Sequence, residues 1–331
     1  MKPAEPSRAD APPVMNRGSS GSDSRPEAIK AVPVKRWGRW IASVVILYIF
    51  AALIYSLAMN PRVQWSVVGD YLFKPIVLKA ALLTIELTVI AMIVGAIGGT
   101  LLAVMRLSGN YVLSGLSWLY IWFFRGTPVY VQIVIWGFFG ALYPKIFIGL
   151  PFTGLAFGGW ATKDVIGGVV AAILALGLNE AAYAAELVRA GIISVDKGQS
   201  EAAESLGMSF PLTMRRIVLP QAMRVIIPPM GNETISMLKT SALVAVIGSV
   251  YELFTQVSRL YSQNFKIMPL LFVACIWYIF FTTLFTIGQH YLERHFGRGF
   301  GTNETVSAEK RAQKRLHQKV TADVGEPGNW D

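Results

Sequence analysis

The hydrophobic positions of this chain fall into long blocks that are separated by shorter polar segments. Blocks long enough to cross a bilayer cover residues 37–59, 77–105, 127–143, 165–193, 222–250 and 269–292. About 20 apolar residues span the hydrocarbon core as a helix. Lipid cannot hydrogen-bond an open backbone, so each block is predicted to be helical. The pattern therefore predicts an all-α membrane protein with six transmembrane helices.

The segments between these blocks have their own character. Residues 1–36 are rich in Pro, Ser, Ala and charge, and too few large apolar groups are present to offset the entropy of ordering, so a disordered tail is expected. Residues 111–124 carry Trp and Tyr side chains that suit a helix at the membrane interface. The Gly- and Pro-rich stretch 144–163 and the stretch 251–268 are predicted as outside loops. The block 37–59 is interpreted as an uncleaved anchor, because the polar region before it is too long for a signal peptide.

Charge and composition narrow the function classes. Of the 331 residues, 53% are apolar and 15% are charged, whereas soluble chains carry about 25% charged residues. The net charge of +10 comes from Lys and Arg that flank the apolar blocks, which excludes a nucleic-acid-binding stripe. These basic residues cluster on one side of the predicted spans, so both termini are expected in the cytoplasm of a bacterial inner membrane, including the polar tail 294–331.

The cytoplasmic loop 196–220 carries the most specific pattern in the chain. Its fixed positions follow the spacing E-A-A-x3-G-x9-I-x-L-P and are Glu201, Ala202, Ala203, Gly207, Ile217, Leu219 and Pro220. This spacing resembles the signature of importer permeases of the ATP-binding-cassette (ABC) class. The resemblance implies that the loop is a short coupling helix that inserts into a cleft of a separate ATPase subunit.

Further segments resemble the polar amino acid branch of these permeases, which imports histidine, glutamine, glutamate, arginine or opines. They are Arg125-Gly126-Thr127-Pro128 with Gln132, Ala182-Tyr183, Ala185-Glu186, Arg189-Ala190-Gly191-Ile192, Lys197-Gly198-Gln199, Pro220-Gln221-Ala222, Pro228-Pro229 and Gly231-Asn232-Glu233. The resemblance covers about residues 70–293 and implies a permease domain with five membrane helices. The helix at 37–59 is then additional to that core.

The resemblance also implies the partners. A second permease subunit, identical or paralogous, pairs with this chain, and ATPase subunits bind ATP and Mg. An extracytoplasmic solute-binding protein delivers a polar amino acid or opine, and lipid surrounds the subunit. The chain itself is expected to bind no cofactor or metal and to be no enzyme, since it lacks a G-x4-G-K-[ST] phosphate loop and its histidines form no ligand cluster.

The local chemistry of the loop suits a compact docking element. Asp196 or Ser200 can cap a short helix, and Glu201 and Glu204 are placed in its first turn, where acids are favourable. Gly207 permits a sharp turn after the helix. Pro220 is expected to begin the next span.

Polar groups inside the spans are candidates for the substrate path, because a charge at a helix centre costs about 2.5–3.5 kcal/mol on insertion scales. These candidates are Glu86, Asn179, Tyr183, Glu186, Glu233, Lys239, Thr240 and Ser241. The alternative for Glu186 is an ion pair with Arg189. Pro228-Pro229 is predicted to interrupt the fifth span, either as a hinge or as a simple kink.

Two other function classes remain open on the residues alone. An ion-gradient-driven secondary transporter would usually show more spans and an internal repeat, and neither is visible here. A nontransporting membrane scaffold would explain the spans but not the loop signature or the polar groups in the spans. The sequence therefore favours the permease subunit of an importer.

Overall fold

The computed structural model describes residues 37–150 and 153–296. The expectation for the tail 1–36 and for most of the tail 294–331 falls on residues outside these ranges. The chain divides after Met59 into two compact units. In the first, the described residues form one helix, α1 (Trp37–Ala58), whose side chains are all exposed and which carries no acidic residue. Its length and composition suit a single membrane crossing.

The second unit is almost entirely helical. Its long helices are α3 (Pro75–Leu107), α8 (Gly168–Ile193), α11 (Leu219–Thr240) and α13 (Ile267–Phe296). The shorter elements are η1 (Pro61–Val63), α2 (Trp65–Leu72), α4 (Tyr111–Gly126), α5 (Val129–Gly137), α6 (Phe139–Leu142), β1 (Lys145–Gly149), β2 (Ala156–Ala161), α7 (Thr162–Val165), α9 (Lys197–Ser205), α10 (Phe210–Thr213), η2 (Met214–Val218), η3 (Ser241–Ile247) and α12 (Leu253–Asn264). The predicted all-α class is confirmed, with one small two-stranded sheet added to it.

The predicted count of six transmembrane helices is not confirmed. Within the described ranges, α1, α3, α8 and α13 are long and apolar enough to cross a membrane. The block 127–143 contains α5, which has only 9 residues. The block 222–250 is split between α11 and a tighter 3₁₀ segment, η3. Each block is therefore divided by a helix end, at Gly137 in the first and at Thr240 in the second, and polar residues lie within each.

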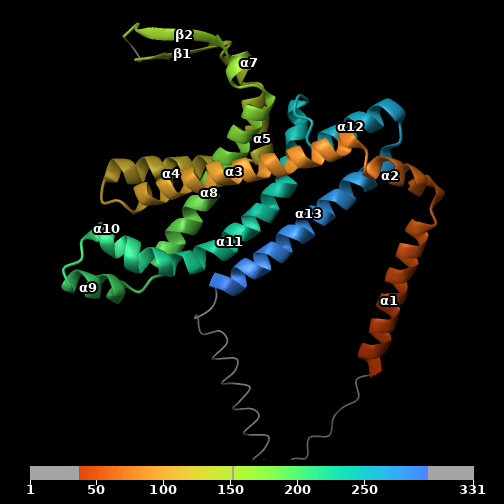
Figure 1. The fold of residues 1–331 in the computed structure, drawn as a ribbon, viewed down its shortest axis with the longest axis horizontal. Coiled ribbons are helices and arrows are strands. Elements are labelled where there is room, and N and C mark those ends of the chain that lie inside the picture. The colour runs from red at the N-terminus through yellow and green to blue at the C-terminus, as the bar shows by residue number, and fades with distance from the viewer. Residues whose placement is uncertain (1–36, 151–152, 297–331) are drawn as a thin grey trace, which may run out of the picture. The chain divides into compact units, whose positions relative to one another are not determined.

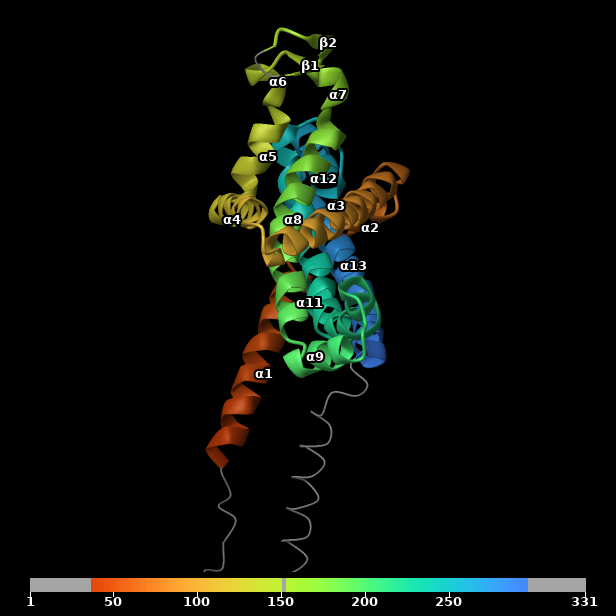
Figure 2. The same cartoon turned by 90° about the vertical axis from the view of Figure 1, so that its left-hand side faces the viewer.

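Helices α3 and α8 make the most extensive helix–helix contact in the second unit (Figures 1 and 2). A Cβ placed on Gly99 would lie 2.5 Å from Cβ of Ala184 and 2.8 Å from the backbone nitrogen of Ala185. A Cβ on Gly177 would likewise lie 2.7 Å from a methyl carbon of Val94. Small residues on both helices therefore let the two backbones approach closely, which is how helices commonly associate in membranes.

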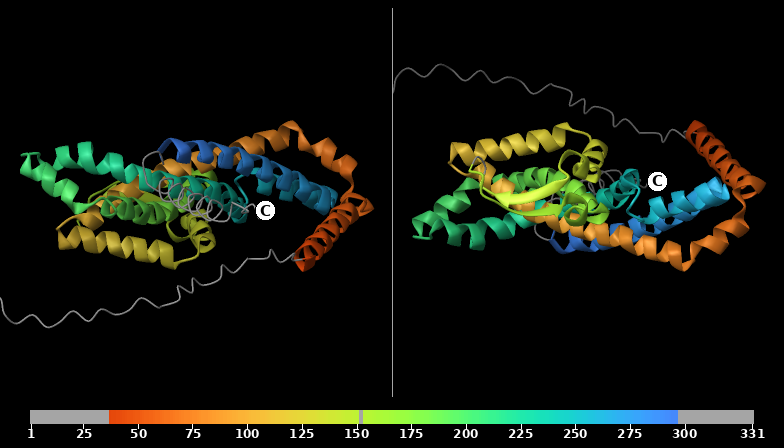
Figure 3. Two further views of the ribbon diagram at one scale, coloured as in Figure 1. Left: turned by 90° about the horizontal axis from the view of Figure 1, so that it is seen from below. Right: turned by 90° about the horizontal axis from the view of Figure 1, so that it is seen from above.

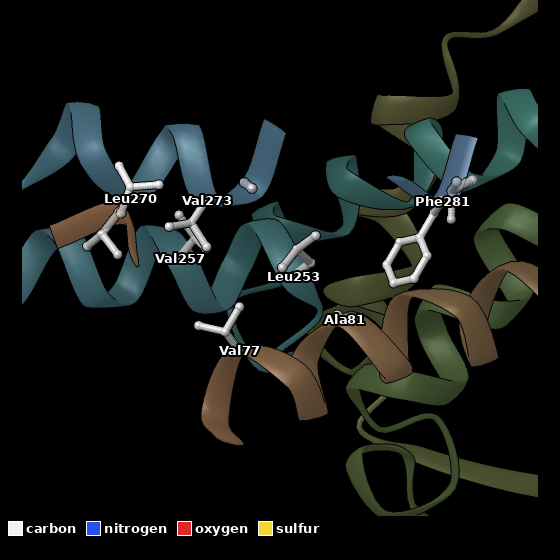
Figure 4. Packing of buried hydrophobic residues seen from close by; sticks show 10 residues of the cluster. Val77, Ala81, Leu253, Val257, Leu270, Val273 and Phe281 are labelled. Carbon is white, nitrogen blue, oxygen red and sulfur yellow. The ribbon is translucent and has the colours of Figure 1, made fainter. Parts of the chain in front are cut away.

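A second packing centre joins α3, α12 and α13. Val77 and Ala81 of α3 pack with Leu253 and Val257 of α12, and Val273 of α13 completes the contact (Figure 4). All five side chains are buried. The apolar face of α12 is thereby covered, so the predicted outside loop at 251–268 contains an ordered amphipathic helix rather than irregular chain.

Glu252 fixes the start of α12. Its carboxylate accepts hydrogen bonds from the backbone nitrogens of Phe254 (2.9 Å) and Thr255 (2.7 Å), and from the hydroxyl of Tyr278 in α13 (3.2 Å). The side chain is completely buried. Burial raises the pKa of the Glu252 carboxyl, and these hydrogen bonds oppose that shift. The residue therefore caps one helix and ties it to another.

The chain from Phe210 to Thr240 is continuous helix. Four residues of α10 lead into a π-helical segment, η2, which passes directly into α11 with right-handed helical dihedral angles at both junctions. Pro228 and Pro229 lie inside α11 without ending it. The prolines therefore do not end the helix, and a hinge or kink at this point stays a prediction. Pro220 lies in the first turn of α11, as predicted, although helical backbone already precedes it from Phe210.

Strands β1 and β2 form an antiparallel hairpin within the predicted loop 144–163. The β-branched and aromatic residues Ile146, Phe147 and Ile148 favour strand, which a count of Gly and Pro overlooked. Figure 2 shows this hairpin and α9 at opposite ends of α8.

The α3–α8 contact yields a direct test. Replacing Gly99 with Val is expected to destabilise the protein by about 1–3 kcal/mol, because a side chain there overlaps the α8 backbone. Replacing Gly288 in α13, where no atom lies within 4 Å of an added Cβ, with Val is the matched control. The midpoint of thermal unfolding in detergent should fall clearly for Gly99→Val and little for Gly288→Val. Equal midpoints for both variants would contradict the close crossing.

Candidate functional site

A pocket of about 520 Å³ opens at the middle of α8. Three structural parts build its wall: the turn between α4 and α5, the centre of α8, and one face of α11. The lining residues are Arg125, Gly126, Thr127, Pro128, Val129, Asn179, Glu180, Tyr183, Glu233, Ser236, Met237 and Thr240. Since Asn179, Glu180 and Tyr183 are central in a helix of 26 residues, which is about 39 Å long, the pocket lies at mid-depth of a membrane-spanning element.

Glu180 is the most unusual residue of this pocket. Its exposed fraction is only 3%, and its Oε1 has no hydrogen-bond partner. Its side chain lies against Gly95 of α3, where a Cβ would approach Glu180 Cγ to 2.3 Å. A buried carboxylate without a full set of partners is costly. An acid held in this way inside a pocket suggests a functional role.

Two further charged side chains, one acidic and one basic, line the pocket with Glu180. Glu233 extends into it from α11, and Arg125 enters from the last turn of α4. The guanidinium carbon of Arg125 lies 5.2 Å from the ring centre of Tyr183, a distance at which a cation is attracted to an aromatic face. The pocket therefore offers two acidic groups, one basic group and an aromatic surface.

Two amide side chains hold the wall in place. Gln132 donates to the backbone carbonyl of Phe124 (2.9 Å) and to Oγ1 of Thr127 (2.7 Å), and it accepts a hydrogen bond from Asn179 (3.2 Å). Asn179 also donates to the carbonyl of Phe124 (3.1 Å). These bonds connect α8 to the α4–α5 turn and fix the backbone position from which the Arg125 side chain extends. Gln132 is buried, and its hydrogen bonds give it a structural role.

The structure separates the predicted substrate-path residues into two groups. Asn179, Tyr183, Glu233 and Thr240 line the pocket. Glu86, Lys239 and Ser241 lie outside it: the first two are exposed, and Ser241 is buried and donates to the carbonyl of Leu238. Glu186 also lies outside the pocket.

Glu186 forms an ion pair instead. Its Oε2 lies 2.7 Å from a guanidinium nitrogen of Arg189, one helical turn further along α8. This is the alternative that sequence spacing had left open for Glu186. Of the three candidates on α8, Asn179 and Tyr183 therefore line the pocket and Glu186 does not.

Sequence reasoning missed Glu180, Ser236 and Met237. The last two fall at i+3 and i+4 from Glu233, with Thr240 at i+7, so a single face of α11 lines the pocket. That spacing could have identified them. Glu180 is adjacent to Asn179 and lies three residues before Tyr183, a helical spacing that could have identified it as well.

The loop 196–220 begins with a capped helix. Oδ1 of Asp196 accepts a hydrogen bond from the backbone nitrogen of Gly198 (2.7 Å), so Asp196 is the cap and α9 begins at Lys197. Glu201 and Glu204 therefore lie beyond the first turn, in which no acidic residue is present. The expected placement of these acids at the helix start is wrong, because the earlier of the two predicted caps is the one used.

Gly207 ends this helix in the left-handed conformation, with φ of 75°. The nitrogen of Met208 donates back to the carbonyl of Ala203 (3.1 Å), closing the turn. No atom lies within 4 Å of an added Cβ at this position. The need for glycine here is thus one of backbone conformation rather than of space.

The remaining signature residues are divided between buried and exposed positions. Ala203 is buried, whereas Glu201, Ala202, Leu219 and Pro220 are exposed, and Ile217 is half-buried within the π-helical segment. Leu206 and Phe210, on either side of the turn, are 83% and 70% exposed. The loop therefore presents a small apolar surface with a carboxylate at the far end of α8 from the hairpin.

The polar groups of the pocket are suited to binding a ligand. Among the described residues, no group of His, Cys, Asp and Glu is arranged to hold a metal ion. Acidic, basic and aromatic side chains instead converge on one space that a small ligand of mixed charge would fit.

Comparison with known proteins identifies related sequences. Residues 95–298 match the family described as binding-protein-dependent transport system inner membrane component. An arginine transport system permease protein of Corynebacterium glutamicum is 43% identical over 95% of this chain and 96% of its own length. The L-cystine transport system permease protein TcyB of Bacillus subtilis is 33% identical over 73% of this chain and 95% of its own.

Two solved structures have a similar fold over about two thirds of this chain. A chain from the crystal structure of an amino acid ABC transporter with histidines has a TM-score of 0.55 and 33% identity, covering 67% of this chain and 94% of that chain. A chain of the MetNI methionine ABC transporter has a TM-score of 0.51 and 17% identity, covering 67% of this chain and 96% of that chain. The second similarity concerns the fold alone.

The orphaned carboxylate gives a stability prediction. Replacing Glu180 with Met is expected to raise the free energy of unfolding by about 1–3 kcal/mol, because it removes a buried acid that is incompletely bonded. The matched change Glu186→Met should shift it by at most about 1 kcal/mol, since that pair is partly exposed. Thermal unfolding of the purified chain measures both. A clear loss of stability in Glu180→Met would show that the carboxylate is structurally satisfied.

Proposed function

This chain belongs to the family of binding-protein-dependent transport system inner membrane components, and from that premise we propose that it is the membrane subunit of an amino acid importer that moves cationic amino acids. In this proposal a separate ATPase supplies the energy and an extracytoplasmic solute-binding protein supplies the substrate. A second permease subunit, identical or paralogous, pairs with it. The ATP and Mg belong to the ATPase, and this chain contributes the path and the coupling surface.

One observation carries the proposal: the pocket and the signature loop are joined by the same two helices. Helix α8 contributes Asn179, Glu180 and Tyr183 to the pocket and leads into α9. The continuous helix from Phe210 returns from the loop and contributes Glu233 and Thr240. A movement of the loop therefore reaches both walls of the pocket through helical segments.

The charges of the pocket support a cationic amino acid. Arg125 is suited to the α-carboxylate, which guanidinium groups bind well. Glu180 and Glu233 are suited to the two positive groups, the α-ammonium and a basic side chain. The similarity to an arginine permease over 95% of this chain supports the same class. Substrates with a neutral side chain would leave one buried carboxylate unpaired, which disfavours them.

Transport follows from these parts as a cycle. The binding protein releases substrate at the extracytoplasmic end, and closure of the ATPase dimer on ATP displaces α9. The helices attached to α9 turn as rigid bodies and open the pocket to that side. Substrate is held between Arg125 and the two acids until hydrolysis reverses the movement. The pocket then opens toward the cytoplasm, and the weakly held substrate leaves.

The coupling role predicts a conformational requirement at Gly207. Replacing it with Val costs about 1–2 kcal/mol, because a branched side chain is unfavourable in the left-handed region, and α9 should lose its C-terminal turn. Asn tolerates this conformation. ATP-driven uptake into proteoliposomes with the complete complex should fall strongly for Gly207→Val and largely survive in Gly207→Asn. Equal uptake by Gly207→Val and the unaltered chain would defeat the coupling assignment.

The substrate class predicts selective effects in the pocket. Charge-assisted hydrogen bonds contribute about 1.5–3 kcal/mol, so Glu180→Gln or Glu233→Gln should raise the KM for arginine uptake by about tenfold to a hundredfold. Glu186→Gln, outside the pocket, is the matched control and should leave KM unchanged. Glutamine and arginine uptake should be compared in the same vesicles. If the pocket variants transport arginine normally, the proposed ligands are wrong, even where the Gly207 result holds.

A further inference from the structure

The hairpin of β1 and β2 carries an unusually apolar exposed surface. Phe147, Ile148, Phe157 and Trp160 are each more than half exposed. No charged residue occurs between Lys145 and Lys163. A two-stranded hairpin is at best marginally stable in water, and an apolar patch of this kind marks an interaction surface.

Strand pairing gathers Ile148 and Phe157 on one face. In the register of the hairpin, Ile148 lies opposite Phe157, whereas Ile146 lies opposite Trp160 on the other side of a register shift between Ile146 and Phe147. Residues directly opposite each other project to the same side of a sheet. The hairpin therefore presents an aliphatic and aromatic face, with Phe147 on the reverse side packed over Gly159.

The hairpin is firmly attached at its base. The backbone nitrogen of Thr162 donates to the carbonyl of Pro144 (3.0 Å), and the Thr162 hydroxyl donates to the carbonyl of Tyr143. Thr162 is buried. In Figures 1 and 3 the strands project sideways from the end of α7 instead of extending the line of α8. The hydrogen bonds of Thr162 thus fix the position of the hairpin relative to α8.

A row of aromatic rings runs from α5 to the base of the hairpin. The ring centres of Trp136 and Phe139 are 5.3 Å apart, and those of Phe139 and Tyr143 are 5.1 Å apart. Trp and Tyr concentrate at the boundary between hydrocarbon and water. Helix α8 has 26 residues, or about 39 Å, which exceeds the hydrocarbon thickness of about 30 Å. Its N-terminal end, next to α7, is therefore expected at that boundary.

We propose that the β1–β2 hairpin lies in the lipid headgroup region of the bilayer, with Ile148, Phe157 and Trp160 in contact with acyl chains. Lys145 and Lys163 bracket the uncharged run and are both exposed, where they can reach lipid phosphates. The hairpin acts as a lateral anchor that fixes the depth of α5 and α8. This inference rests on the membrane location of α8 and not on the transported substrate.

Lipid fits this surface better than a docking protein does. A reversible protein interface is about as polar as the rest of a protein surface and carries a polar rim. The hairpin carries no charge between Lys145 and Lys163. It continues from helices α5 and α8, which themselves expose apolar side chains such as Ile135 and Val169. A solute-binding protein or a second copy of this chain would be the occupant if the test below fails.

The test uses the complete transporter in phospholipid vesicles and exploits the single cysteine of the chain, Cys275. With Cys275 replaced by Ala, spin labels are placed at Ile148→Cys, at Phe157→Cys and at the control Ser262→Cys on the exposed side of α12. Collision rates with oxygen, which concentrates in lipid, are compared with those of a water-soluble nickel chelate. Collisions with oxygen should dominate at residues 148 and 157, and collisions with the nickel chelate at residue 262. The depth parameter, which is the logarithm of the ratio of the two collision rates, should therefore have opposite signs at the hairpin and at the control position.

Three outcomes would overturn the proposal. Nickel dominating at 148 and 157 would place the hairpin in water. Loss of access to both probes in the assembled complex would mean that protein covers it, as in contact with a second copy. A fall in access on adding the solute-binding protein would assign the surface to that partner. Unchanged oxygen access on that addition supports the lipid contact.

Discussion

The close approach of α3 and α8 is the constraint on which the remaining structure depends. Gly99 and Gly177 bring the two backbones together, and Ala184 and Ala185 leave no room for larger groups. In lipid, where apolar burial between helices contributes little, such tight contact is itself a principal source of stability. The same contact seats Glu180 against α3 at Gly95. Packing and pocket chemistry are therefore determined by one set of small residues.

Two buried acids illustrate how burial alone fails to reveal a role. Glu252 is fully buried and its carboxylate receives hydrogen bonds from two backbone nitrogens and a tyrosine hydroxyl. Glu180 is almost as deeply buried, yet one of its oxygens has no partner in the described structure. The first acid is part of the framework, because its bonding is complete. The second retains unused bonding capacity, which is what a binding group requires.

The sequence anticipated the parts of this structure that local chemistry determines, and failed where tertiary contacts decide. Hydropathy located α3, α8 and α13, and the turn at Gly207 followed from the known preference of glycine. The sequence did not show that Pro228 and Pro229 would stay within α11. There α13 packs nearby, and Gln289 approaches the carbonyl of Pro228. Nor did spacing along α8 show which acid faces the pocket, because Glu186 pairs with Arg189 on its own helix, whereas Glu180 is buried against Gly95 of α3.

The π-helical segment at Met214–Val218 has a geometric consequence for the helix that contains it. A π turn accommodates an extra residue within the helical ladder, and one residue corresponds to about 100° of rotation in an α-helix. Were this segment to tighten into regular α-helix, everything beyond it would be rephased about the helix axis. Glu233 and Thr240 would then rotate away from α8. A small axial shift near Ile217 would thereby change which side chains line the cavity.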